Sequence, residues 1–286
     1  MELDAIGKRL PRKVTTPLAS GYWPELDQSC ELNAERLNYL QRLIGILQWI
    51  CELGRLDIMM PVSMLSRYLV SAKGGHLEQV FHVFAYLKTH ETSTIVFDDS
   101  EPDFDDYRFK DCDWPEYYPN AAEAIPKDMP KQCGRAVMCS CFVDADHAGC
   151  QVTRRSHTGE IIFVNRAPIL WYSKGQNTVE LSTFGSVFVA MRIANGMVEG
   201  LQYKLRMMGV PIEGPYIVFC DNNAVVINSK NPESMLKKKH TAINYHCTRE
   251  AIAAKTIQVA KEDTTTNLAD LLTKCNPGPT LKNLNF

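Results

Sequence analysis

An alternation of strand-like and helix-like segments runs through the second half of this 286-residue chain. Three apolar, strand-like segments follow one another closely, and a long helical pattern from Ser182 to Met208 separates them from two more. The five segments are 136–146, 159–165, 167–173, 215–221 and 256–262. Hairpin-connected strands followed by a crossover helix imply an α/β fold, with helices flanking a mixed five-stranded sheet.

Shorter helical patterns complete this region at 223–229, 244–255 and 266–274. The first part of the chain is mainly helical by the same reasoning. Apolar residues at helical spacing predict a helix from Asn33 to about Leu53. Pro61 suits the first turn of a second helix that ends near Ser71. A third helix is predicted from His76 to His90, and a strand at 93–99.

Residues 98–133 interrupt the periodic patterns with acidic clusters, prolines and aromatic residues. Together with Phe97 they carry 4 basic and 11 acidic side chains, whereas residues 134–275 carry 16 basic and 12 acidic ones. This composition predicts a linker or an extended surface insertion. The expected division of the chain is an extended lead-in, a small helical region, the acidic linker, the α/β domain and a tail, at 1–30, 31–97, 98–133, 134–276 and 277–286.

The N-terminus has no apolar segment of the kind found in signal peptides, and no apolar run is long enough to span a bilayer. Ten scattered cysteines without a CxxC pair favour a reduced, intracellular protein, cytoplasmic or nuclear, with no membrane partner. His147 and Cys150 offer two zinc ligands, but no second pair follows at the spacing of a zinc finger.

Three aspartates lie where the α/β pattern builds sites. Asp144 comes at the end of the first strand, Asp221 at the end of the fourth, and Asp270 in the first turns of the last helix. Carboxylates gathered from distant parts of a chain repel one another unless a cation holds them, and oxygen ligands favour Mg²⁺ or Mn²⁺. Each aspartate also suits a plain role as a cap or turn residue, so spacing alone leaves both interpretations open.

Several motifs, in the same order along the chain, resemble the ribonuclease H domain of copia-type retrotransposon Pol polyproteins. They are "FVDADHAGC", "RRSHTGEIIFVNRAPILWYSKGQNTVELST", "VFCDNNAVVINSKNP", "KKKHTAINYHCTREAI" and "TTTNLADLLTK". The resemblance covers roughly residues 134–276. The upstream stretch, which includes "YLQRLIGILQWICELGRLDIMMPVSMLSRYL", is similar to the segment that follows the reverse-transcriptase palm in the same polyproteins.

This resemblance implies a ribonuclease H fold that cuts the RNA strand of an RNA–DNA hybrid with two Mg²⁺ ions held by acidic residues. It maps ligands onto Asp144, with Asp146 the less favoured choice, and onto Asp221 and Asp270. The fourth ligand is a Glu in the family pattern S-T-x-x-x-E-[YF]-x-A. In this chain the pattern begins at Ser182, and the expected Glu is Val187.

No other carboxylate replaces the missing one on the sequence evidence. Glu180 lies seven residues earlier, about 10 Å along a helix axis, and Glu199 is farther away in the other direction. Val187 also extends an apolar stripe of its helix. We therefore expect the cation to be weakly held and ribonuclease activity to be strongly reduced or absent. The rival interpretation is a non-catalytic remnant or co-opted module that binds nucleic acid or protein.

Basic and polar residues near these motifs are candidates for contacts with an RNA–DNA hybrid. They are Arg154, Arg155, Lys174, Asn222, Lys238 and Lys239. Ser156, Trp171 and Tyr172 are further candidates for backbone or sugar contacts. Exposed basic residues need no ligand, so a solvated surface explains the basic ones equally well. The remainder of a Pol polyprotein is the other expected partner.

Overall fold

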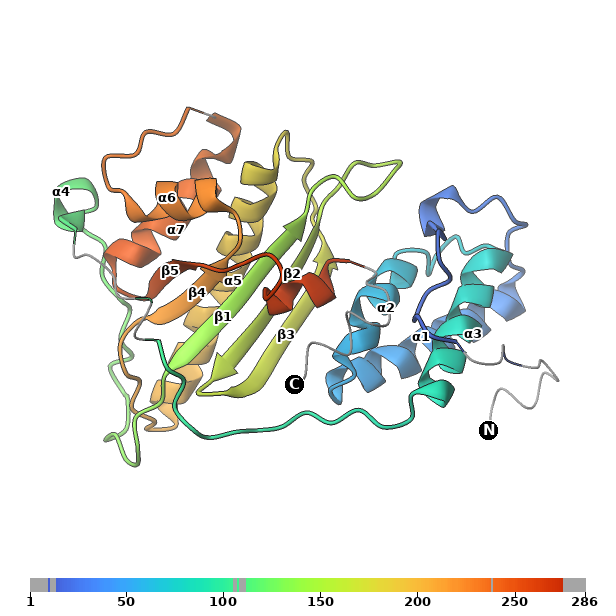
Figure 1. The fold of residues 1–286 in the computed structure, drawn as a ribbon, viewed down its shortest axis with the longest axis horizontal. Helices are drawn as coiled ribbons and strands as arrows, with labels where there is room; N and C mark the ends of the chain where they lie inside the picture. Colours follow the sequence, from blue (N-terminus) through green and yellow to red (C-terminus); the bar gives the residue numbers. More distant parts are fainter. Residues whose placement is uncertain (1–9, 11–13, 105–106, 108–111, 238, 275–286) are drawn as a thin grey trace.

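The computed structural model describes residues 10, 14–104, 107, 112–237 and 239–274, and Figure 1 shows how their elements are arranged. Buried apolar side chains form two large groups. The first group, here the helical core, lies among the helices before residue 90. The second group, here the sheet core, lies between a five-stranded sheet and a long helix.

Three α-helices surround the helical core: α1 (Ala34–Glu52), α2 (Met59–Ser66) and α3 (Gly74–Thr89). Short 3-10 helices precede α1 and α2, at Pro24–Leu26 (η2) and Leu56–Ile58 (η3). Asn33 caps α1, because its side chain accepts a hydrogen bond from the amide of Arg36. The predicted second helix is present but begins earlier and ends at Ser66, with Pro61 in the first turn, where its missing amide hydrogen costs nothing.

The strand predicted at 93–99 is wrong. Residues 91–99 run as an extended connection with no partner strand, and the side chains of Val96 and Phe97 are largely exposed. β-branched and aromatic residues favour strands only where a neighbouring strand and a packed face are available. The connection crosses from α3 towards the far end of the sheet (Figure 1).

The predicted mixed five-stranded sheet is confirmed. Its strands lie in the order β3-β2-β1-β4-β5. The strands are β1 (Cys139–Asp146), β2 (His157–Val164), β3 (Ala167–Gly175), β4 (Tyr216–Cys220) and β5 (Ile257–Lys261). The first three pair antiparallel, whereas β4 runs parallel to both β1 and β5. The carboxyl ends of β1 and β4 therefore meet at the same edge of the sheet.

Helices flank both faces of this sheet (Figure 1). The long helix α5 (Thr183–Met207) packs on one face over Cys141 and Val143, and α6 (Asn223–Lys230) and α7 (Ala242–Ala253) join it around the sheet core. The predicted helix at 266–274 is a 3-10 helix, η6 (Leu268–Leu272), on the opposite face. Side chains alternate along β1, so Phe142 and Asp144 face η6.

The acidic segment at 98–133 is mostly irregular and contains one short helix, α4 (Trp114–Tyr117). Its aromatic rings lie against the sheet region. The rings of Phe104 and Tyr107 contact Phe219, at centroid distances of 5.6 and 4.9 Å. Trp114 also lies beside the guanidinium of Arg249, 5.1 Å from its ring centroid. The described part of this segment is thus packed along the surface.

The helical region contacts the sheet region directly. Met59, at the start of α2, packs against Ile161 and Leu272. Beside this apolar contact, Arg67 donates a hydrogen bond to Nδ1 of His157 over 2.6 Å. His157 is only 2% exposed. Burial and the neighbouring Arg67 charge lower the pKa of His157 to about 3.

The neutral state of His157 predicts a loss of stability in mild acid. An unfolded His binds a proton near pH 6.5, whereas the buried one does not, so this group lowers stability progressively as the pH falls from about 6.5 towards 3. His157→Gln keeps one acceptor and one donor but cannot titrate. Between pH 7 and pH 5 the variant should lose about 2 kcal/mol less unfolding free energy than the natural protein, measured by urea denaturation. Equal pH dependences of the unfolding free energy in the variant and the natural protein would contradict a neutral, buried His157.

Candidate metal centre

The three aspartates singled out by the sequence lie together in the structure. Asp144 comes from β1, Asp221 directly follows β4, and Asp270 lies in η6. One carboxylate oxygen of each lies within 4.8 Å of the others. Parallel pairing of β1 and β4 accounts for the first two, and η6 brings the third to the same edge from the far end of the chain. We refer to these residues as the acidic triad.

The chemistry of the triad fits a divalent cation. Asp144 is 5% exposed, and burial together with the nearby Asp270 raises the pKa of its carboxyl above the ordinary value, against opposing effects of Lys274 and Thr273. Burial and the charge of Asp144 raise the pKa of Asp221 in the same direction. Crowded, partly desolvated carboxylates of this kind gain most from a cation, and Mg²⁺ and Mn²⁺ prefer such oxygen ligands.

Asp146, the alternative ligand on β1, is not part of the triad. Its carboxylate lies directly against Gly149, where a Cβ atom would be only 1.6 Å from Oδ2. The side chain therefore packs into the turn that leaves the strand. His147 and Cys150 belong to no group of three potential ligands among the described residues, so the structure gives the zinc interpretation no further support.

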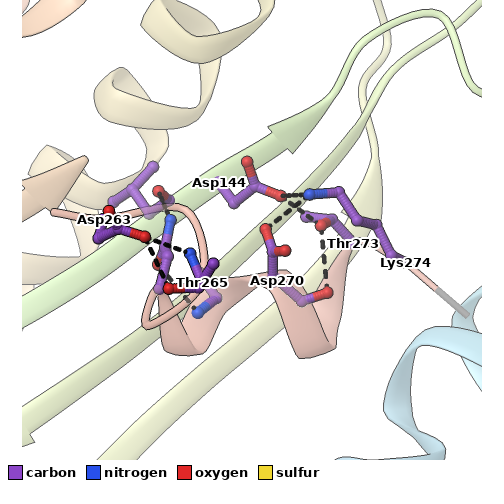
Figure 2. A network of polar contacts seen from close by, with 9 residues as sticks. Asp144, Asp263, Thr265, Asp270, Thr273 and Lys274 are labelled. Atoms are coloured by element: carbon purple, nitrogen blue, oxygen red, sulfur yellow. Dashed lines mark hydrogen bonds and ion pairs between the residues drawn. The ribbon is translucent and has the colours of Figure 1, made fainter. Parts of the chain in front are cut away.

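Two residues that the sequence analysis did not single out, Thr273 and Lys274, contact the carboxylates of the triad. Figure 2 shows the ammonium of Lys274 between the carboxylates of Asp144 and Asp270, with nitrogen–oxygen distances of 3.7 and 2.7 Å. Burial opposes the charged ammonium, but the two carboxylates outweigh it and raise the pKa of Lys274. The hydroxyl of Thr273 donates a hydrogen bond to Oδ2 of Asp144. The i to i+4 spacing of Asp270 and Lys274 is the signal that could have predicted this ion pair.

The segment that carries Asp270 is held by polar side chains of its own. Asn267 is almost fully buried, and its amide donates to the carbonyl of Val143 over 3.1 Å while accepting from the amide of Ala269 over 3.1 Å. The carboxylate of Asp263 organises the preceding turn through the amide and hydroxyl of Thr265 (Figure 2). Asn267 therefore couples η6 directly to β1, next to Asp144.

The position expected to supply a fourth carboxylate holds a core residue. Val187 is 3% exposed and packs in the sheet core. Glu180 lies against the first turn of α5, where a Cβ at Gly185 would be 2.6 Å from its Oε2. Among the described residues, the acidic triad is the one group of three or more potential ligands, and it contains neither Glu180 nor Glu199.

The structure contains one further buried acid that the sequence did not indicate. Glu160 is fully buried and lies opposite Val143 in the β1–β2 register, on the α5 face of the sheet. Neither of its carboxyl oxygens has a hydrogen-bond partner. Burial raises its pKa well above the ordinary value, because an apolar environment disfavours the charged form. It belongs to the opposite face from Asp144 and is not in the triad.

The candidate hybrid-binding residues differ in how exposed they are. Arg154 and Arg155, in the β1–β2 loop, and Lys174, on β3, are exposed, as is Lys239 in the 3-10 helix η5 (Lys239–Thr241). Lys238 lies outside the described residues. Asn222 caps α6, accepting from the amide of Val225 over 3.2 Å. Three other candidates are partly or fully buried: Ser156, Trp171 and Tyr172.

No family model matches the chain. Two curated relatives match nearly all of it. They are the retrovirus-related Pol polyproteins of transposon TNT 1-94 from Nicotiana tabacum, 26% identical over 280 residues, and of transposon RE1 from Arabidopsis thaliana, 24% identical over 263 residues. The matches span 96% and 92% of this chain but only 18% and 15% of the relatives' lengths. The resemblance to copia-type Pol polyproteins is thereby confirmed.

Solved ribonuclease H structures also match about half of the chain. The N-terminal RNase H domain of a Mycobacterium tuberculosis protein covers 52% of it, with a TM-score of 0.38 and 10% identity, and 99% of that chain is matched. LC11-RNase H1 in complex with an RNA/DNA hybrid covers 50%, with a TM-score of 0.38 and 12% identity, and again 99% of that chain is matched. In the described part of the protein, no helix is both long and apolar enough to cross a membrane.

Asn267→Ala tests how η6 is held. The variant removes two hydrogen bonds from a buried position, so we expect a loss of about 1–3 kcal/mol in unfolding free energy and a smaller rise of melting temperature with added Mn²⁺. Asn33→Ala removes a matching cap from α1, far from the triad, and should lower stability without changing the Mn²⁺ effect. Equal Mn²⁺ effects in the two variants would show that Asn267 does not support the triad.

Proposed function

We propose that residues 134–276 form a ribonuclease H-like module of a retrotransposon Pol polyprotein that binds RNA–DNA hybrid and retains a damaged divalent-cation site. The acidic triad carries this proposal, because three carboxylates from separate elements lie within 4.8 Å at one edge of the sheet. Mg²⁺ or Mn²⁺ is the cofactor that such oxygen ligands favour. Residues 31–97, whose helical core also includes Val14 and Leu18 of the lead-in, form the accompanying helical unit, and 98–133 the connection.

Asp144, Asp221 and Asp270 would hold the cation, with Thr273 and Asn267 fixing the first and the last of them. When bound, two such ions activate a water and stabilise the leaving oxygen in phosphodiester cleavage. The remaining task of the chain is to place a hybrid's backbone beside the triad. The exposed Arg154, Arg155 and Lys174 supply positive charge for that purpose.

The site is weakened because it has three carboxylates where the family pattern has four. Val187 offers no lone pair, and its side chain is packed in the sheet core. Loss of a group that merely supports a metal ligand typically costs 10–100-fold in affinity or activity, and loss of a ligand itself costs at least as much. We therefore propose that cleavage of hybrid is slow or absent.

The second candidate function is a non-catalytic module that binds nucleic acid or another part of a Pol polyprotein. Lys274 favours it, because its ammonium pairs with Asp144 and Asp270 and neutralises part of their charge. The two candidates differ in one measurable property. The enzyme cleaves a labelled RNA–DNA hybrid in the presence of Mg²⁺, and the binding module retains the hybrid intact.

Val187→Glu tests the proposal most directly. The added carboxylate should raise the number of Mn²⁺ ions bound and raise hybrid cleavage by roughly 10–100-fold or more. Val187→Gln is the matched control, because glutamine has nearly the same size as glutamate but carries no charge. Circular dichroism checks that both variants fold, because a polar group enters a buried position. Asp144→Asn combined with Val187→Glu should abolish the gain, and natural protein that already cleaves as fast as the Glu variant would contradict the proposal.

Lys174→Ala tests the basic surface. A residue that contacts phosphate should weaken hybrid binding about equally for different sequences and reduce the slope of log affinity against log salt by about 0.9. Lys204 is an exposed lysine near the C-terminal end of α5. The control variant Lys204→Ala should leave the affinity and the salt slope unchanged. Fluorescence anisotropy with a labelled hybrid at several salt concentrations measures them. Identical salt slopes for the two variants would remove Lys174 from the interface.

A further inference from the structure

A chain of hydrogen bonds connects the helical region to η6 through the sheet. Arg67, which follows α2, contacts Nδ1 of His157 on β2 through Nη2 at 2.6 Å. Nε2 of His157 lies 2.8 Å from the hydroxyl of Ser173 on β3. That hydroxyl donates to the backbone carbonyl of Leu272 over 2.7 Å. We call Arg67, His157 and Ser173 the relay.

The protons of the relay can be arranged in only one way. A guanidinium only donates, so Nδ1 of His157 must accept, and the ring proton must lie on Nε2. The hydroxyl of Ser173 gives its own proton to Leu272, so it accepts from Nε2. Each group has one direction of donation, and His157 and Ser173 are 2% and 7% exposed. Arg67 is exposed, but its hydrogen bond ends on the buried ring of His157, and buried groups with one possible direction of donation are fixed in orientation.

Close backbone contacts hold both ends of the relay. Gly175 lies opposite His157 in the β2–β3 register, and a Cβ there would be 2.4 Å from Nη2 of Arg67. The guanidinium therefore lies directly over the end of β3. At the other end, a Cβ at Gly159 would be 2.7 Å from the carbonyl of Ala269. η6 thus lies directly on β2, and the relay joins two elements that already pack against the same strands.

The relay ends in η6, the segment that contributes Asp270 to the acidic triad. Leu272 comes two residues after Asp270 and directly before Thr273, whose hydroxyl bonds Asp144. It is also the last residue of η6, where a carbonyl has no partner within the helix. Ser173 supplies that partner. The position of Leu272 in turn affects both Asp270 and the contact between Thr273 and Asp144.

We propose that Arg67 is a positioning residue for the acidic triad, acting through His157 and Ser173. The helical region thereby sets the spacing of carboxylates that lie on the sheet. Where the readout is cation affinity, this inference rests on the proposed function, but hydrogen exchange of η6 tests it without any cation. Arg67 touches neither the triad nor its cation, so its effect is carried entirely by the orientation of η6.

The experiment compares Arg67→Ala, Ser173→Ala and the double variant in the full chain. Amide hydrogen exchange of residues 268–274 should be roughly tenfold faster in each single variant than in the natural protein. The double variant should exchange no faster than the single variants, because both changes break the same chain of hydrogen bonds. Mn²⁺ affinity should fall about tenfold in each, as for other residues that orient metal ligands. His157→Gln can still accept from Arg67 and donate to Ser173, so it should stay within twofold of the natural protein in both measurements.

Arg36→Ala removes an exposed arginine of α1 and serves as the control for general effects on the helical region. The relay is overturned if Arg67→Ala behaves as this control does, or if the single effects simply add in the double variant. If the natural protein binds no Mn²⁺, the cation part of the proposed function fails, and the exchange of residues 268–274 still decides whether the relay holds η6.

Discussion

Three negative charges held within 4.8 Å of one another are the constraint on which the sheet region is built. Such a cluster is unfavourable by itself, and each arrangement around it reduces the cost. Lys274 lies between two of the carboxylates, Thr273 donates to Asp144, and Asn267 ties η6 to β1. Burial and mutual repulsion raise the pKa of Asp144 and of Asp221. The surrounding structure therefore keeps the acids close together at one edge of the sheet.

The sheet and the triad were predictable because their signals are local. Apolar segments of strand length, a long amphipathic helix and aspartates at strand ends can all be read along the chain, and parallel strands bring their carboxyl ends to one edge. The helix predicted from Asn33 rests on a local signal too, and in the structure Asn33 caps it. The strand expected at 93–99 shows the limit of such signals. Its composition favours a strand, but it pairs with no strand of the described structure, and strand pairing is decided by the fold as a whole.

The residues that support the site could not be found from the sequence because they act across long separations. Thr273 and Asp144 are 129 residues apart, Asn267 and Val143 are 124 apart, and Arg67 and His157 are 90 apart. Nothing near His157 indicates that it is buried and neutral, or that an arginine from another region contacts it. Asp146 is the opposite case. It lies on the same strand and face as Asp144, yet its carboxylate packs against Gly149, and only the turn geometry excludes it from the triad.

The charge that remains at the triad also decides what kind of evidence can separate an enzyme from a binding module. Three carboxylates and one ammonium leave a net negative site, which repels a phosphate that approaches it. A bound divalent cation removes that repulsion whether or not the phosphodiester is then cut. Cation-dependent binding of a hybrid is therefore expected of both candidate functions. Cleavage differs between them, because only the proposed enzyme also uses its bound cations to activate a water and to stabilise the leaving oxygen.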